Sequence, residues 1–158
     1  MILPATIDIV MKIGFAIGLG SVIGLERTFA GKGAGMRTYA MVSLGAAIFI
    51  IISETVLSQF PDQALANPLL VASAIITGIG FIGAGLMMSK DHKITGLTTA
   101  AGLWIAAGVG MASGFGLFNL ATVATVAGLL VFTVLWFIEN FLKRFSYYKN
   151  QMDDEDHR

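Results

Sequence analysis

Five long runs of apolar residues, separated by short polar or glycine-rich segments, make up most of the chain. A helix needs about 20 residues to cross roughly 30 Å of hydrocarbon, and each run is close to that length. The runs are Ala5–Leu25, Thr38–Ser58, Pro68–Ser89, Thr95–Ser113 and Gly116–Ile138. The pattern predicts an all-α fold, a polytopic transmembrane bundle of five helices.

The division between the fourth and fifth runs depends on three residues. Ser113, Gly114 and Phe115 are the residues that could form a turn there. One long apolar region is the alternative, but its length suits two membrane crossings better than one. We therefore expect a helical hairpin at this point.

The composition favours lipid as the solvent for most of the chain. Of its 158 residues, 56% are hydrophobic and 13% are charged, whereas soluble domains have about 25% charged residues. A soluble chain of this length could not bury so much apolar surface. The basic residues form no patch of the kind that binds nucleic acid. The lack of cysteine excludes disulfides and thiolate metal ligands.

The positions of the basic residues predict the orientation of the bundle. If the N-terminus lies outside, the cytoplasmic segments are residues 26–37, residues 90–94 and the residues after Ile138. All Lys and Arg residues except Lys12 then lie on the cytoplasmic side: Arg27, Lys32, Arg37, Lys90, Lys93, Lys143, Arg144, Lys149 and Arg158. This asymmetry follows the positive-inside rule. We expect a transmembrane domain over residues 1–140, in the cell (inner or plasma) membrane, and a short charged cytoplasmic tail over residues 141–158.

Three glycines have the spacing of a dinucleotide-binding turn. Gly78, Gly80 and Gly83 match G-x-G-x-x-G, a motif that needs a strand before it and an acidic residue about 20 positions further on. Here the apolar run continues into the glycines, and Leu97–Leu103 contains no acid. Small residues in membrane helices instead let helix backbones approach closely. We expect a helix-packing role for Gly78, Gly80, Gly83, Gly85, Gly102 and Gly110.

Four short blocks in a fixed order resemble the MgtC/SapB family of bacterial and archaeal membrane proteins. The blocks are GLER and AGMRT within Ile23–Ser53, and GIGFIGAG and GLTTAA within Ile76–Phe118. The family has a membrane domain of five spans. MgtC itself is associated with growth at low magnesium and with survival inside macrophages, and it is reported to act on the proton-translocating ATP synthase. The resemblance implies a regulatory membrane protein with a membrane complex such as ATP synthase as its partner.

The sequence departs from the family pattern at several positions. Family members carry an aspartate, an arginine and a glutamine on the way into the third span, where this chain has Asn67, Leu70 and Ala74. The second glutamate of the family's GLERE block is Thr28 here. The chain ends in YYKNQMDDEDHR, where MgtC has a soluble C-terminal domain. We therefore expect a short member that consists of the membrane domain only.

Polar residues at the cytoplasmic ends of the spans form the main candidate site. The planar guanidinium of arginine makes several hydrogen bonds at once, and the family blocks centre on Glu26 and Arg37. We expect a polar network formed by Glu26, Arg27, Arg37, Thr38, Thr98 and Thr99. The alternative is a topology anchor, which we expect of Lys32, Lys90 and Lys93. The glycine-rich loop Gly31–Thr38 also raises the hypothesis of a bound lipid phosphate.

Three ionisable residues lie inside the predicted spans, near their outer ends. Asp8 and Lys12 are spaced i, i+4, in the order that favours an ion pair, and Glu54 lies near the outer end of the second run. Ionisable groups inside a membrane are functional candidates, because they need a partner or a water-filled cavity. The alternative is that Lys12 extends to the interface and pairs with Asp8.

Catalytic and metal-binding patterns are missing from the sequence. The histidines are His92 and His157, and no H-E-x-x-H or G-x-S-x-G motif occurs. Asp8 and Glu54 are too few for a magnesium site, which needs several oxygen ligands. We expect a protein that is not an enzyme and that has no cofactor and no metal site.

Two functions remain open from the sequence. The first is regulation of membrane energetics or of magnesium or proton homeostasis through a membrane partner. The alternative is a small transporter or channel for an ion or another solute. Membrane lipid is a further expected partner, a homodimer through the small-residue surfaces stays open, and nucleic acid is not expected.

Overall fold

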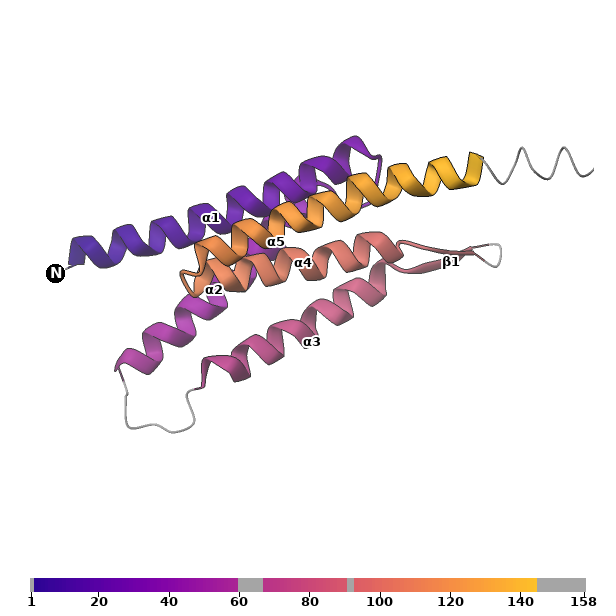
Figure 1. Ribbon diagram of the computed structural model, residues 1–158. Helices are drawn as coiled ribbons and strands as arrows, with labels where there is room; N and C mark the ends of the chain where they lie inside the picture. The colour runs from indigo at the N-terminus through magenta and orange to yellow at the C-terminus, as the bar shows by residue number, and fades with distance from the viewer. Residues whose placement is uncertain (1, 60–66, 91–92, 145–158) are drawn as a thin grey trace, which may run out of the picture.

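The computed structural model describes residues 2–59, 67–90 and 93–144, which form an almost entirely helical molecule (Figure 1). Its helices are α1 (Ile2–Phe29), α2 (Met36–Gln59), α3 (Pro68–Leu86), α4 (Leu97–Gly114) and α5 (Phe118–Leu130). α5 continues through a short π-helical segment, η1 (Val131–Leu135), to Arg144, and we call Phe118–Arg144 the long fifth helix. All 5 helices are long and apolar enough to cross a membrane. The predicted all-α class with five apolar helices is confirmed.

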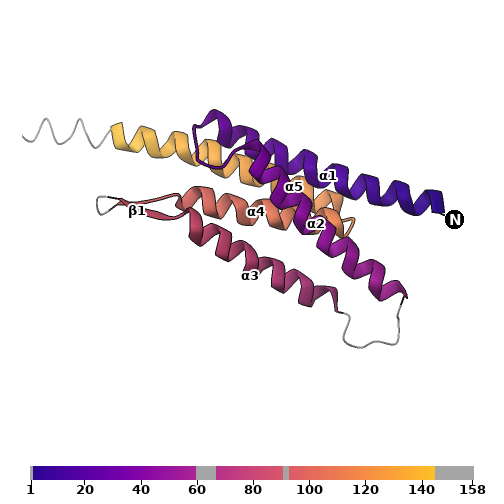
Figure 2. The same ribbon diagram turned by 180° about the vertical axis from the view of Figure 1, so that it is seen from behind.

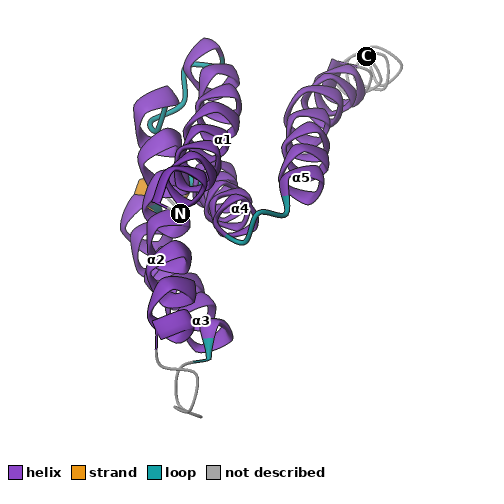
Figure 3. Ribbon diagram, turned by 90° about the vertical axis from the view of Figure 1, so that its left-hand side faces the viewer, coloured by secondary structure: helices purple, strands orange, loops and turns teal. Residues whose placement is uncertain are grey.

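α4 lies at the centre of the bundle and contacts each of the other four helices. α1 and α2 are neighbours with extensive contact, and α3 packs mainly on α4. α5 packs on α4 and α1 and stands apart from α2 and α3 (Figure 3). α4 therefore joins α3 and α5 to the pair formed by α1 and α2.

Small residues explain the central position of α4. Gly102, Gly110 and Gly114 lie on one face of the helix because four- and eight-residue spacings return to the same side. An added Cβ at Gly110 would lie 2.1 Å from the Ser43 carbonyl oxygen, and one at Gly114 would lie 2.9 Å from the Ala47 carbonyl oxygen. These glycines let the backbones of α2 and α4 approach closely, as small residues do in membrane helices.

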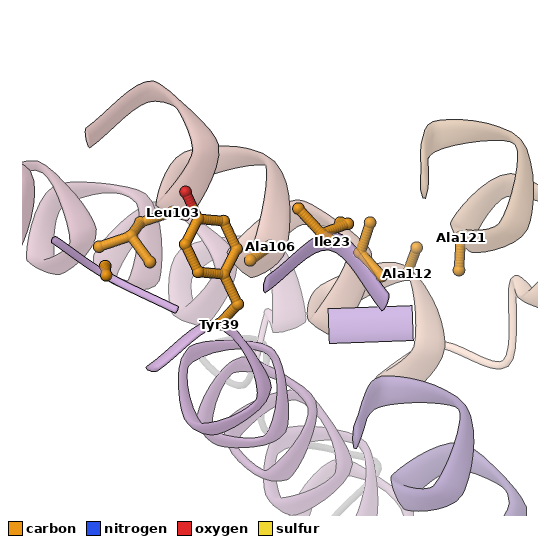
Figure 4. Packing of buried hydrophobic residues seen from close by; sticks show 8 residues of the cluster. Ile23, Tyr39, Leu103, Ala106, Ala112 and Ala121 are labelled. Atoms are coloured by element: carbon orange, nitrogen blue, oxygen red, sulfur yellow. The ribbon is translucent and has the colours of Figure 1, made fainter. Parts of the chain in front are cut away.

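A hydrophobic core surrounds this contact. Ile23 of α1, Tyr39 of α2 and Leu103 of α4 are fully buried. Figure 4 shows the Tyr39 ring close to Leu103 and Ala106, and Ala121 brings α5 into the same cluster. Four helices therefore share one core, which fixes the positions of the polar groups at its two ends.

The segment between α3 and α4 differs from the prediction. The third helix ends at Leu86, not at Ser89, and the fourth begins at Leu97. Between them, β1 (Met88–Lys90) and β2 (Lys93–Thr95) form a two-stranded antiparallel hairpin. The predicted helix through Ser89 is therefore wrong, and the prediction contains no hairpin.

Gly96 determines how the chain returns from the hairpin into α4. Its φ angle is +88°, and an added Cβ would lie 2.3 Å from the Leu86 carbonyl oxygen. Only glycine, which has no Cβ, readily adopts this left-handed conformation and lets the backbone come so close to Leu86. The start of α4 is thereby held against the end of α3.

The remaining helix boundaries agree with the prediction to within several residues. α1 covers Ile2–Phe29, longer than the expected Ala5–Leu25. α4 ends at Gly114, and Gly116 has a φ angle of +73°, so the expected helical hairpin is confirmed. The long fifth helix includes residues 141–144, which were expected to begin the tail, and residues 145–158 lie outside the described part of the chain.

Charged residues collect at the two ends of the bundle. The α1–α2 turn, the β-hairpin and the end of the long fifth helix lie at one end, on the right in Figure 1 and on the left in Figure 2. We call it the basic end, because it carries Arg27, Lys32, Arg37, Lys90, Lys93, Lys143 and Arg144. The opposite end, which we call the Lys12 end, carries Asp8, Lys12 and Glu54.

Candidate functional site

Arg27, in the last turn of α1, is a buried charged residue at the basic end, with only 4% of its surface exposed. Its Nε donates a hydrogen bond to Oε2 of the neighbouring Glu26. The guanidinium carbon lies 3.6 Å from the centroid of the Phe132 ring, which makes a cation–π contact. A buried charge needs such partners because its desolvation is costly.

Gly102 of α4 makes room for two aromatic side chains next to Arg27. The Phe132 Cζ atom lies 2.8 Å, and the Tyr39 hydroxyl oxygen 2.2 Å, from where a Cβ of Gly102 would be. The Tyr39 hydroxyl donates a hydrogen bond to the Thr99 carbonyl oxygen at 3.2 Å. Phe132 belongs to η1, and π-helical segments of this kind are frequent at functional sites. Side chains from α2 and the long fifth helix thus meet over one glycine, and Arg27 of α1 lies over the Phe132 ring.

A cavity of about 1250 Å³ opens beside Arg27, between α1, the start of α4 and the second half of the long fifth helix. We call it the basic-end cavity. Its polar lining residues are Glu26, Arg27, Lys32, Thr98, Thr133, Glu139, Asn140 and Lys143. The rest of the lining is apolar and includes Leu25, Phe132 and Trp136. The basic-end cavity is therefore lined by both cationic and apolar side chains.

The structure divides the predicted polar network into two parts. Glu26, Arg27 and Thr98 line the basic-end cavity, and Thr99 is buried beneath the Tyr39 hydroxyl. Arg37 and Thr38 are both exposed on α2. Thr38 lines a separate groove between α2 and α3. The described residues give Arg37 no hydrogen-bond or ion-pair partner, so it does not join the Arg27 network.

Tyr39 and Phe132 are the two site residues that the sequence did not indicate. Tyr39 belongs to a periodic set on α2, with Ser43, Ala46 and Ile50, that forms the buried face of that helix. Helical spacing could therefore have identified Tyr39 as a core residue. Nothing in the sequence distinguishes Phe132 from its apolar neighbours, because its position depends on η1.

Thr28, which replaces a family glutamate, joins α1 to the start of α2. Its hydroxyl donates to the Gly24 carbonyl oxygen at 3.0 Å and accepts a hydrogen bond from the Met36 backbone N–H at 3.1 Å. The first N–H of α2 is therefore already bound within the hypothetical phosphate-binding loop Gly31–Thr38. Asn67, at the family's aspartate position, accepts from the Leu69 N–H at 2.9 Å and caps α3.

The three ionisable residues at the Lys12 end lie together. Lys12 Nζ is 3.1 Å from Glu54 Oε2 and 3.3 Å from Asp8 Oδ2. The Lys12 side chain is only 14% exposed, whereas the carboxylates of Asp8 and Glu54 are 50% and 36% exposed. One lysine therefore links α1 to α2 and balances two carboxylates, and both the predicted Asp8 pairing and an additional one are present.

Replacing Lys12 with methionine is expected to destabilise the bundle by about 1–2 kcal/mol. The change keeps the length of the side chain but leaves two carboxylates close together without a cation, and their partial exposure limits the loss. The midpoint of unfolding in mixed micelles measures the effect. Lys12→Arg keeps the charge, so its midpoint of unfolding is expected to stay close to that of wild type. Adding Asp8→Asn and Glu54→Gln to Lys12→Met removes the unpaired carboxylates and should recover stability. Equal stability of Lys12→Met and Lys12→Arg would contradict this role.

The six predicted packing glycines fall into two groups. An added Cβ at Gly102 or Gly110 would overlap α2, and one at Gly83 would lie 3.4 Å from the Ala100 Cβ. An added Cβ at Gly78, Gly80 or Gly85 would meet no atom within 4 Å. The last three glycines therefore pack against no other helix within the described chain, and whether they pack against a helix of another protein stays a prediction. They flank the contact of α3 with α4 on both sides, and we call the outer surface that they border the open face of α3.

Metal-binding side chains do not gather anywhere in the described part of the chain. Over residues 2–59, 67–90 and 93–144, no group of three or more His, Cys, Asp or Glu side chains could hold an ion. His92 and His157 lie outside these ranges. The arrangement offers hydrogen-bond donors and positive charge at the basic end rather than a ligand set for a cation.

The fold defines the class of this molecule as an all-helical, multi-pass membrane protein. The family model described as MgtC family matches residues 13–141. This chain belongs to the MgtC family, as its four sequence blocks implied.

Three curated relatives illustrate the similarity. "Putative magnesium transporter YhiD" of Escherichia coli (strain K12) is 38% identical over 133 residues, which cover 82% of this chain and 61% of that protein. "Protein MgtC" of Brucella abortus (strain 2308) is 42% identical over 108 residues, which cover 68% of this chain and 43% of that protein. "Protein MgtC" of Salmonella typhimurium (strain LT2) is 40% identical over 111 residues, which cover 70% of this chain and 45% of that protein. The chain thus spans less than two thirds of each relative. No solved structure matches it.

Proposed function

We propose that this protein is a non-enzymatic regulator in the cell (inner or plasma) membrane that acts in magnesium or proton homeostasis by binding a larger membrane complex, with ATP synthase as a candidate. The proposal includes an external N-terminus and a cytoplasmic basic end. Membership of the MgtC family supports a role in the membrane, and the name of YhiD supports the link to magnesium. The basic residues at one end of the bundle support the orientation.

The open face of α3 is the observation that carries this proposal. An added Cβ at Gly78, Gly80 or Gly85 would meet no atom of the described chain within 4 Å. The open face is bordered by two apolar grooves on different sides of α3. A groove of about 620 Å³ between α2 and α3 includes Gly78, and one of about 800 Å³ between α3, α4 and α5 includes Gly80. Small residues beside apolar grooves allow a helix of another membrane protein to pack closely. This face suits a protein that works by binding a partner's helix.

A small ion or solute transporter is the second candidate function. The ionisable residues inside the spans and the name of YhiD favour it. However, the Glu26–Arg27 pair and the Asp8–Lys12–Glu54 group lie at opposite ends of the bundle, with the hydrophobic core around Tyr39 and Leu103 between them. This separation favours partner binding over transport.

Flux measurements in proteoliposomes distinguish the two functions. The wild-type protein is compared with Glu26→Gln and Lys12→Met for proton and magnesium flux. Regulation through a partner predicts no flux above that of empty liposomes from a correctly folded sample. Flux that falls in either variant would make the protein a transporter and would overturn the regulatory proposal.

Filling the open face of α3 is expected to abolish activity without loss of the fold. A side chain added at Gly78 or Gly80 begins in open space, where a Cβ would meet no atom within 4 Å, and leucine there would block the approach of a partner helix. In a strain that needs this protein for growth at low magnesium, Gly78→Leu and Gly80→Leu should grow like the deletion strain. Gly14→Leu and Gly18→Leu on α1 are matched controls, since both glycines also face open space, and they should grow like wild type. Normal growth of both α3 variants would count against the proposal.

A further inference from the structure

The terminal nitrogens of Arg27 lack acceptors within the described chain. A guanidinium has five N–H donors, and the Arg27 Nε–H is bonded to Glu26. Over the described residues, no hydrogen bond is made by its two Nη atoms, although only 4% of the residue is exposed. Among the described residues, Ser43 Oγ is the only fully enclosed polar side-chain atom without a hydrogen-bond partner. The Arg27 Nη atoms are therefore not fully enclosed, and Arg27 lines the basic-end cavity. Unsatisfied donors in such a place call for an acceptor in the cavity.

The charges around the cavity favour an anionic acceptor. Glu26 is paired with Arg27, and Glu139 is paired with Lys143. Lys32 also lines the cavity and has no ion-pair partner among the residues that the structure describes. Three cations against two carboxylates leave one positive charge. The planar fork of an arginine matches the oxygens of a phosphate group.

The apolar part of the lining favours an amphiphile over a free ion. Besides the polar groups, the lining contains aliphatic and aromatic side chains such as Leu25, Leu129 and Phe137. Trp136 also lines the cavity and is half exposed, as is typical of aromatic residues at a membrane interface. A soluble phosphate would use the polar groups only, whereas a phospholipid would use both parts of the lining.

We propose that the basic-end cavity binds an anionic phospholipid, with its phosphate on the Arg27 Nη atoms and its acyl chains along the apolar wall of the long fifth helix. The lipid fills the space between α1 and that helix and so holds the Phe132 segment in place. The proposal goes beyond the proposed function, because it concerns α1 and the long fifth helix, not the open face of α3. Failure of the lipid site therefore leaves partner binding by α3 untouched, and the reverse also holds.

Lipid titration of the purified protein tests the proposal. The probes are phosphatidylglycerol, phosphatidylcholine and inorganic phosphate, added to delipidated protein in micelles, and the readouts are the thermal midpoint and the lipid adducts seen by native mass spectrometry. We expect phosphatidylglycerol to raise the midpoint and to form a one-to-one adduct. Arg27→Gln should weaken this binding about tenfold or more, as expected for the loss of a charge-assisted hydrogen bond.

Two matched variants separate lipid binding from folding. Arg37→Gln removes the same charge at the same end from an exposed, unpaired position and should bind phosphatidylglycerol like wild type. Lys32→Gln alters an exposed residue of the loop, so it should fold normally and weaken binding several-fold. If Arg27→Gln, Lys32→Gln and Arg37→Gln all bound phosphatidylglycerol equally well, the basic-end cavity would not be the lipid-binding site. Equal stabilisation by phosphatidylcholine, or by inorganic phosphate alone, would overturn its assignment to an anionic lipid.

Discussion

Gly110→Ala is expected to destabilise the folded bundle by about 3 kcal/mol, at the upper end of the usual cost of overpacking. The added methyl group would lie 2.1 Å from the carbonyl oxygen of Ser43 and 2.7 Å from its carbonyl carbon. Because these are backbone atoms, no side-chain rotation relieves the overlap, and α2 and α4 must separate. The midpoint of unfolding in mixed micelles measures the change.

Gly108→Ala on the same helix is the matched control. A Cβ at Gly108 would meet no atom within 4 Å, so the substitution adds no contact. Removing a flexible glycine from a helix interior should make this variant as stable as wild type or more stable, by about 0.5–1 kcal/mol. If Gly108→Ala and Gly110→Ala were equally stable, the close packing of α2 on α4 would be incorrect.

Arg27→Met is expected to lower stability by about 2–3 kcal/mol. The variant loses the hydrogen bond to Glu26 and the cation–π contact with Phe132, and it leaves the Glu26 carboxylate without its partner at a partly buried position. Arg37→Met removes an exposed arginine from the same end of the molecule and is expected to change stability by less than about 0.5 kcal/mol.

A double-mutant cycle with Phe132→Leu shows whether the ring and the guanidinium act together. The contact predicts that Phe132→Leu lowers the stability of the Arg27→Met variant less than it lowers the stability of wild type. The difference is the coupling energy of the two side chains, about 1 kcal/mol. Strict additivity of the two substitutions would mean that the contact between them contributes nothing to stability.

The number and class of the helices could be predicted because the length of an apolar run directly limits what can cross a bilayer. The hairpin between α3 and α4 could not. Met87 and Met88 continue the apolar run of α3 without a clear change of periodicity, and Gly96 approaches the end of α3 at Leu86. Such a tertiary contact leaves no local signal in the sequence.

The candidate site was predictable where neighbours in sequence are neighbours in space. Glu26 with Arg27, and Asp8 with Lys12, follow from sequence spacing. Arg37 was wrongly placed with Arg27, because the buried face of α2 begins at Tyr39 and Arg37 lies on another side.

The contact of Arg27 with Phe132 has a different origin. It joins the first and last described helices, and Phe132 belongs to the π-helical segment η1. Contacts of this kind depend on the packing of the whole bundle. The same is true of the Lys12–Glu54 pair, which needs α1 and α2 to be in register.

Site-specific photo-crosslinking in native membranes tests the central proposal, that α3 binds a partner, most directly. A photoreactive phenylalanine is placed at Ile82, which lines the groove between α2 and α3, and at Val10 on the exposed surface of α1 as a control. We expect a discrete adduct with another membrane protein from Ile82, lost when Gly78→Leu is added, and no such adduct from Val10. Adducts with lipid alone at both positions, in membranes where the protein is active, would contradict the proposal.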